Sequence, residues 1–247
     1  MTEDVPADCV RVAVGRRTAV ALEAYADDAR AMLARGSLYE AASSDRGARP
    51  LQGRGIAYAI ALPVSGTPAV VRHNRHGGLF APVTRDLFLP PTRAPYELRS
   101  AMRLAELGVP TPPVLMYSVE PAGVAFRRAD VVTREVENAR DLSAYMSPAV
   151  SGAEREAAWD ATRDLLAAMH AVGVRHHDLN VKNVLLASAT GRLIAYVLDV
   201  DRVEFGRAAD MRLYAANVAR LLRSARKWRD ERGATFDERE LATLVAA

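Results

Sequence analysis

The spacing of apolar residues changes near residues 135–140, and this change constrains the fold more than any other feature of the sequence. Apolar runs of strand length precede it, at residues 56–62, 68–73, 114–119, 123–126 and 130–136. After it, apolar residues recur mainly at helical spacing. We therefore expect an α+β fold of two lobes with a cleft between them. Residues 1–136 should form a strand-rich lobe and residues 137–247 a helical one.

Helical spacing also predicts where the helices lie. The expected helices cover about residues 17–35, 95–107, 151–173 and 210–227. Ser151 and Glu154 have the spacing of a capping box, which marks the start of the third of these helices. Residues 40–55 are rich in Ser, Gly and Arg, so we expect a loop there.

Composition narrows the environment of the 247-residue chain. No apolar run approaches the roughly 20 residues needed to cross a bilayer. The N-terminal residues 1–8 are acidic and lack the basic start and apolar stretch of a signal peptide. Cys9 is the single cysteine, which excludes an intramolecular disulfide. These features favour the cytoplasm, and the net charge of +3 gives no sign of a nucleic-acid partner.

A stretch rich in Asp and Asn follows the predicted helix at 151–173. It reads His176-His-Asp178-Leu-Asn-Val-Lys-Asn183, the H-x-D-x-x-x-x-N spacing of the protein-kinase catalytic loop. Asp199 follows in a second turn. Phosphoryl transfer needs a carboxylate for the acceptor hydroxyl and oxygen ligands for Mg²⁺. Asp178, Asn183 and Asp199 can supply both; the alternative is an Asx-rich hairpin turn.

The first lobe should then contain groups that bind phosphate. Gly53, Arg54 and Gly55 precede a predicted strand, and small residues there would let backbone N–H groups approach a phosphate. A plain glycine-rich loop is the alternative.

A cation is also expected near the phosphates. Lysine occurs only at Lys182 and Lys227, so Arg72 stands where kinases carry the lysine of Val-Ala-Ile-Lys. Glu97, near the start of a predicted helix, would pair with Arg72. The alternatives are a solvent-facing arginine and a favourable charge in the first turn of a helix.

One absence limits the class of acceptor. Only about nine residues separate Asp201 from the last predicted helix near Asp210. That is too short for the long activation segment of a peptide-directed kinase, and His177 replaces the Arg that would read a phosphate in that segment. A small or glycan acceptor fits better.

At this point the chain resembles the lipopolysaccharide kinases, and most closely the 3-deoxy-D-manno-octulosonic acid (Kdo) kinases. The residues that carry the resemblance are Gly53–Gly55, Val71–Leu79, Thr92–Glu97, Leu107–Pro112, His176–Asn180, Leu198–Arg202 and Asn217–Ser224. The chain departs from the pattern at Asn74, His76 and Val200, where an aromatic residue, an Arg and a Phe are expected.

The resemblance implies transfer of the γ-phosphate of ATP to a Kdo hydroxyl, expected to be the 4-hydroxyl, on a lipid A precursor. The implied place is the cytoplasmic face of the bacterial inner membrane, with peripheral membrane contact and Mg²⁺ as cofactor. By match to the motif, Asp178 would be the catalytic base, with Asn183 and Asp199 as metal ligands. The residues implied to bind the nucleotide are Gly53, Arg54, Gly55, Arg72 and Glu97.

Acceptor contacts are expected around the same site. Arg220, Arg223 and Lys227 share one face of the last predicted helix and could hold an anionic glycolipid or the membrane surface. The full expected set is Arg75, Gly77, Gly78, Asn180, Asp201, Arg220 and Arg223. A solvated helix face and a plain turn are the alternatives. Two other functions stay open: a kinase for a heptose or aminoglycoside, and a non-catalytic binding module.

Overall fold

The computed structural model describes residues 5–51, 55–74, 91–123, 126–189 and 191–235. The chain divides into two compact units. The first contains Met1–Met102 and Pro113–Glu135, and the second contains Arg103–Pro112 and Val136–Ala247. The α+β class with a strand-rich N-terminal part and a helical C-terminal part is confirmed. The segment 103–112, expected in the first lobe, groups with the second unit.

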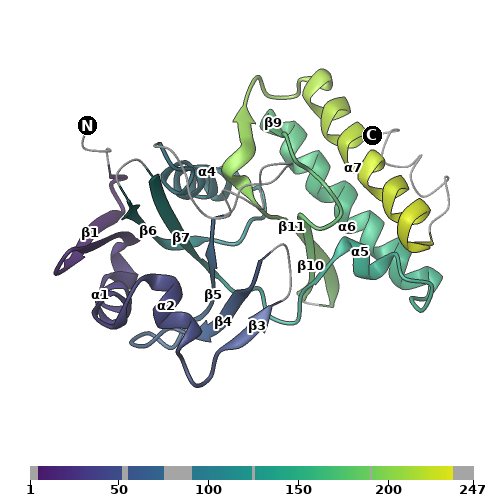
Figure 1. Ribbon diagram of the computed structural model, residues 1–247. Helices are drawn as coiled ribbons and strands as arrows, with labels where there is room; N and C mark the ends of the chain where they lie inside the picture. Colours follow the sequence, from purple (N-terminus) through teal and green to yellow (C-terminus); the bar gives the residue numbers. More distant parts are fainter. Residues whose placement is uncertain (1–4, 52–54, 75–90, 124–125, 190, 236–247) are drawn as a thin grey trace. The chain divides into compact units, whose positions relative to one another are not determined.

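The first unit is built on a seven-stranded antiparallel sheet with the order β1-β2-β6-β7-β5-β4-β3 (Figure 1). Its strands are β1 Cys9–Val14, β2 Arg17–Leu22, β3 Arg49–Leu51, β4 Ala57–Ala61, β5 Pro68–His73, β6 Val114–Ala122 and β7 Phe126–Arg134. Strand β5 lies between β7 and β4, with Arg72 opposite Val131 and His73 opposite Asp130. Because side chains alternate along a strand, Arg72 and His73 point to opposite faces of the sheet.

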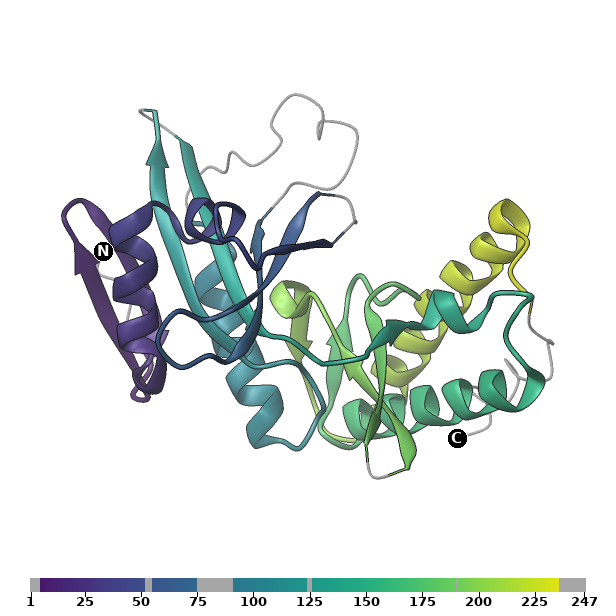
Figure 2. The same ribbon diagram turned by 90° about the horizontal axis from the view of Figure 1, so that it is seen from below.

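Two helices cover one face of this sheet. Helix α1 (Ala26–Arg35) packs on β1 and β2, and α2 (Leu38–Ser43) packs on β4, β5 and β7 (Figures 1 and 2). Met32, Leu38 and Val71 belong to the buried apolar cluster between them, so the inward face of β5 carries Val71. Burying a side chain of this size contributes roughly 1.5–3 kcal/mol each.

Two expectations for this unit were wrong. Residues 17–22 form β2 instead of helix, because Arg17–Leu22 pairs residue by residue with β1 across a turn at Gly15, whose φ is +59°. A 3-10 turn at Glu23–Tyr25 then leads into α1, so the predicted helix is confirmed only from Ala26. The predicted loop at 40–55 contains most of α2 and all of β3.

Helix α4 (Ala94–Glu106) confirms the helix expected at 95–107. Ala94, Leu98 and Leu104 are fully buried on one side of it. Glu97 is buried in its first turn.

The second unit contains the long helices. Its elements are β8 Arg140–Asp141, α5 Leu142–Tyr145, α6 Gly152–Ala171, β9 Val174–His176, β10 Val184–Ala189, β11 Arg192–Val197, a 3-10 turn at Val200–Arg202, β12 Val203–Phe205 and α7 Met211–Arg232. The predicted capping box is confirmed: the Ser151 hydroxyl accepts from the N–H of Glu154, whose carboxylate accepts from Ser151 in return. Helix α7 packs against α6 and β9 (Figure 2).

Gly173 turns the chain from α6 into β9. Its φ is +69°, a left-handed conformation that favours glycine. Its carbonyl accepts a hydrogen bond from the N–H of Gly206 at 2.8 Å, and any Cβ here would collide with the backbone carbonyl of Arg207. This close approach brings the segment after β12 against the start of β9, and β12 pairs with β9 directly before the loop at residues 177–183.

Candidate active site

His176 is the fixed point of the loop between β9 and β10. The side chain is buried, and its Nδ1 accepts a hydrogen bond from the backbone N–H of Asp178 at 3.1 Å. Its Nε2 lies 2.9 Å from the carbonyl oxygen of Leu198. A carbonyl can only accept, so the proton must reside on Nε2. The imidazole thereby joins the Asp178 turn to the end of β11.

Burial and the surrounding charges act on the pKa of His176 in opposite directions. Burial lowers the pKa of His176, which favours the neutral tautomer that both hydrogen bonds require. The Leu198 carbonyl and then the charges of Asp199, Asp178 and Asp201 act in the opposite direction and raise this pKa.

Asp178 and Asn183 share one turn. The side-chain amide of Asn183 donates to the backbone carbonyl of Asp178 at 2.9 Å. Asn180 donates to the same carbonyl at 2.9 Å and accepts from the N–H of Lys182, so its amide braces the loop. The turn is therefore closed by its own amide side chains, and the carboxylate of Asp178 is left to point elsewhere.

Asp199 comes to this turn through the β10–β11 hairpin. The hairpin pairs Val184 with Val197, and beyond that pair the N–H of Leu198 donates to the carbonyl of Asn183 at 2.9 Å. Asp199 follows directly with a φ of 54°, a left-handed conformation that is uncommon outside glycine. The structure thus brings the predicted residues Asp178, Asn183 and Asp199 to one end of the hairpin.

The donor set at this end fits Mg²⁺. The nitrogen of the Asn183 amide is occupied by the Asp178 carbonyl, so the amide oxygen faces away from that bond as a hard ligand. Asp199, which follows Leu198 at the same end of the hairpin, offers a carboxylate. Within the described part of the chain, no group of three or more His, Cys, Asp and Glu could hold a metal by itself. Mg²⁺ is commonly bound by one or two carboxylates together with substrate phosphates, so the pair fits this ion.

Helix α7 follows this loop with a row of polar side chains. Asn217 is buried; it accepts from the N–H of His176 at 2.9 Å and donates to the carbonyl of Val174 at 2.8 Å. Ser224 accepts from the N–H of Val181 at 3.2 Å. Between them, Arg220 forms an ion pair with Oδ1 of Asp178. Residues three and four apart lie on one face of a helix, so this row is continuous.

Arg72 and Glu97 form an ion pair in the first unit. The Glu97 side chain is only 3% exposed, so the charge of Arg72 compensates a carboxylate that is almost out of water. Asn74, where an aromatic residue was expected, accepts from Nη1 of Arg72 at 2.8 Å. Two acceptors therefore fix the direction of this guanidinium.

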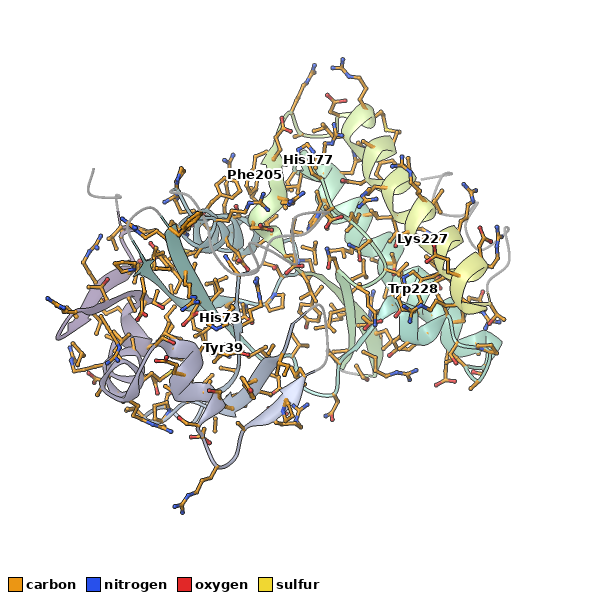
Figure 3. The ribbon with its side chains drawn as sticks, in the orientation of Figure 1. Tyr39, His73, His177, Phe205, Lys227 and Trp228 are labelled. Carbon is orange, nitrogen blue, oxygen red and sulfur yellow. The ribbon has the colours of Figure 1, made fainter. Side chains whose placement is uncertain are left out.

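The opposite face of β5 carries a polar cluster that sequence reasoning missed. Nδ1 of His73 lies 2.5 Å from Oδ1 of Asp130, and the other carboxylate oxygen accepts from the N–H of Tyr39. The rings of Tyr39 and His73 stack with centroids 3.6 Å apart (Figure 3). Burial, with the charge of Asp130 next, raises the pKa of nearby Glu120. A buried acidic residue inside the apolar strand 130–136 was the available signal.

The remaining predicted residues are less informative. Gly53, Arg54, Arg75, Gly77 and Gly78 lie outside the described residues. Gly55 lies in a bend and is partly buried. Asp201 is in the 3-10 turn after Asp199, and Arg223 is exposed on α7. The segment expected to be short is short: one turn and β12 lead to α7, which Asp210 caps by accepting from the N–H of Arg212.

Within the described ranges, no helix combines the length and apolar character that a membrane span requires.

A strand-rich unit followed by a helical unit, with the H-x-D-x-x-x-x-N spacing in the loop between β9 and β10, is typical of phosphotransferases of the protein-kinase-like class. The model of the lipopolysaccharide kinase (Kdo/WaaP) family matches residues 41–246. The chain therefore belongs to the lipopolysaccharide kinase (Kdo/WaaP) family.

Curated relatives agree with this assignment. The 3-deoxy-D-manno-octulosonic acid kinase of Actinobacillus succinogenes is 33% identical over 199 residues, which is 78% of this chain and 81% of that protein. The protein of the same name from Stenotrophomonas maltophilia is 34% identical over 208 residues, 81% of this chain and 78% of its own length. A solved structure of WaaP in complex with acyl carrier protein matches with a TM-score of 0.54 at 20% identity. That match covers 88% of this chain and 83% of the other, and it supports the fold.

Proposed function

We propose that this chain is an ATP-dependent kinase that phosphorylates a hydroxyl of Kdo, the 4-hydroxyl, on a lipid A precursor. Two observations support the proposal. Relatives with about a third of their residues in common are named for this sugar acid. The hydrogen bonds of the 176–183 loop hold Asp178 and Asn183 in one turn, and the hairpin brings Asp199 to it.

Each residue has a role in this reaction. The acceptor oxygen bonds to the γ-phosphorus of ATP, the bond from that phosphorus to the β–γ bridging oxygen breaks, and ADP leaves. Asp178 orients the acceptor hydroxyl and receives its proton. Arg72 contacts the α- and β-phosphates in the direction that Glu97 and Asn74 give it. Gly53, Arg54 and Gly55 approach the phosphates through backbone N–H groups.

Mg²⁺ would be held by Asn183 and Asp199, and when bound it neutralises the negative charge of the phosphates. The acceptor is an anionic glycolipid, so we place the protein at the cytoplasmic face of the inner membrane. Arg75, Gly77, Gly78, Asn180, Asp201, Arg220 and Arg223 are proposed to border the acceptor. The exposed Arg223 and Lys227 of α7 are suited to lipid phosphates.

The test is phosphate transfer from labelled ATP to purified Kdo–lipid A with the purified protein and MgCl₂. We expect one labelled phosphate on the Kdo, and no labelling after EDTA treatment. A heptosylated core and an aminoglycoside serve as competing acceptors. Faster labelling of either competitor would assign the protein a different acceptor. Failure to turn over ATP with any acceptor would indicate a non-catalytic binding protein.

A further inference from the structure

Arg220 lies beside the proposed catalytic carboxylate, on a stretch of α7 that is hydrogen-bonded to the same loop. Its guanidinium pairs with Oδ1 of Asp178, and the two side chains are 36% and 23% exposed. The neighbouring residues Asn217 and Ser224 hold the backbone of the same loop at 2.9 and 3.2 Å. With anchors one turn away on either side, Arg220 cannot move along the loop without breaking them. The hydrogen bonds between α7 and the loop therefore fix the position of the Asp178–Arg220 ion pair.

Both members of the Asp178–Arg220 pair can form further hydrogen bonds. The guanidinium uses Nη2 for Asp178, and an arginine has five N–H donors in a planar fork. Such a fork binds a carboxylate or phosphate with two parallel hydrogen bonds. On the other side, Oδ1 of Asp178 is occupied by Arg220, so Oδ2 is the oxygen that can accept from an acceptor hydroxyl. A reacting hydroxyl and an anionic group next to it could thus be held by two adjacent side chains.

We propose that Arg220 is a specificity-determining residue that binds the carboxylate of the acceptor sugar, so that this carboxylate and Asp178 share one guanidinium. The inference rests on the proposed function, and it names the feature of the acceptor that the site recognises: an acidic group within reach of Arg220 when the hydroxyl meets Asp178. A neutral sugar leaves the free side of the fork without a partner. Sites that expect a charged hydrogen-bonding group discriminate strongly against analogues that lack it.

The experiment compares two acceptors that differ only in this group, Kdo–lipid A and the methyl ester of its Kdo carboxylate. We expect the wild-type protein to have a kcat/KM about 10- to 100-fold higher for the acid, the range for losing a charged hydrogen bond. In Arg220→Gln the value for the acid should fall by at least about tenfold, and the preference for acid over ester should disappear. Arg220→Lys, which keeps the charge and loses the fork, should retain part of the preference.

Arg212→Gln is the matched control. Arg212 lies on the same helix, pairs with Asp210, and its side chain is 91% exposed. Arg220 follows it by eight positions, which correspond to about 12 Å along the helix. This variant should keep the wild-type preference. ATP affinity and thermal unfolding, measured for each variant, check that the fold is intact, and Arg220→Lys serves if Arg220→Gln does not fold.

The outcomes separate this inference from the proposed function. An Arg220→Gln variant that loses rate equally on both acceptors with its preference intact would show a purely structural role and overturn the inference. A wild-type protein that phosphorylates acid and ester equally well overturns the inference and leaves the kinase assignment standing. A wild-type protein that turns over ATP but phosphorylates neither acceptor overturns the proposed function, and the inference with it.

Discussion

Asn217 of α7 holds the backbone of His176 at the start of the proposed catalytic loop. Its amide oxygen accepts the N–H of His176 at 2.9 Å while its amide nitrogen donates to the carbonyl of Val174 at 2.8 Å. Both bonds are buried. One side chain therefore completes the hydrogen bonding of a three-residue strand whose outer partner is the short β12. The position of the loop depends on a contact between elements far apart in the sequence.

Asn217→Leu should reduce both stability and turnover. It leaves a buried N–H and a buried carbonyl unsatisfied, which costs about 1–3 kcal/mol for each group. Asn217→Asp is the matched control, because its carboxylate still accepts from His176 but no longer donates to Val174. Urea unfolding should give both variants a lower free energy of unfolding than the wild type. Equal stability of the Leu variant and the wild type would mean that the two hydrogen bonds of Asn217 do not stabilise the fold.

The burial of His176 predicts a pH dependence of stability. Burial lowers the pKa of this imidazole in the folded state below its unfolded value of about 6.5. Between the two values the unfolded chain binds more protons, so the free energy of unfolding falls as pH decreases below about 6.5. Above that pH this residue adds no slope. The slope cannot exceed about 1.4 kcal/mol per pH unit for a single proton.

The measurement is urea unfolding between pH 7.5 and 5.0 in EDTA, so that metal binding does not contribute. His176→Asn is the control, since its amide oxygen can replace Nδ1 as acceptor for Asp178 and it does not titrate. The variant should be less stable at pH 7.5 because it loses the Leu198 bond, and its acid slope should be smaller than that of the wild type. Identical slopes would exclude His176 as the source.

The Arg72–Glu97 pair predicts coupled effects on stability. Arg72→Ala removes the charge of Arg72 from beside the nearly buried Glu97 carboxylate, and breaking such a pair from one side is more costly than removing both partners. The double variant Arg72→Ala/Glu97→Ala should therefore lose less stability than the sum of the losses in the two single variants. The expected coupling is about 1–3 kcal/mol in a double-mutant cycle. Strict additivity would mean that the pair carries no net interaction.

The same arginine should affect nucleotide binding. Loss of a charged contact to phosphate raises the KM for ATP by about 10- to 100-fold in Arg72→Ala. Arg72→Lys should recover part of the affinity, because it keeps the charge without the planar fork. An unchanged KM for ATP in both variants would remove Arg72 from the nucleotide site.

Asp178→Ala should lower kcat by about 10²- to 10⁴-fold while ATP affinity is nearly kept, as expected for a residue that acts on the acceptor proton. Glu204→Gln is the control: Glu204 is an exposed carboxylate on β12 that pairs with His177 at 2.9 Å. This variant should keep the wild-type kcat. Loss of ATP affinity with the residual turnover intact would reject Asp178 as the base.

Much of the second unit could be predicted from sequence because its signals are local. The capping box at Ser151 and the H-x-D-x-x-x-x-N spacing each act within a few residues. These short-range rules hold whatever the rest of the chain does, so the two long helices and the loop between them were placed correctly. The α+β class followed from the same local patterns.

Other features depend on contacts between residues distant in sequence, so local patterns could not predict them. Residues 17–22 have a spacing compatible with a helix, but pairing with β1 and β6 makes them a strand. Tertiary pairing of this kind overrides local preference. Arg220 looked like one of several cations on a helix face, and only the packing of α7 on the loop shows its contact with Asp178. The polar row on α7 was hidden because Asn217 interrupts an apolar stripe.

Gly173 controls how closely the end of α6 approaches the segment after β12. Its φ of +69° already favours glycine, and a Cβ would lie 2.8 Å from the backbone nitrogen of Ala208 besides colliding with Arg207. Backbone atoms cannot turn aside as a flexible side chain can. Gly173→Ala should therefore displace β12 from β9 and disturb the loop that starts at His176.

Gly108→Ala separates the cost of a positive φ from the cost of the steric collision. Gly108 has a similar φ of +74°, and no heavy atom lies within 4 Å of its hypothetical Cβ. In this variant the free energy of unfolding should fall by only about 1 kcal/mol, because alanine disfavours a left-handed backbone. Turnover should be kept. Gly173→Ala carries that cost plus the collision, so thermal unfolding should show the larger loss, with kcat reduced as well. If both variants lose equal stability and keep full turnover, the close approach at Gly173 does not position the proposed catalytic loop.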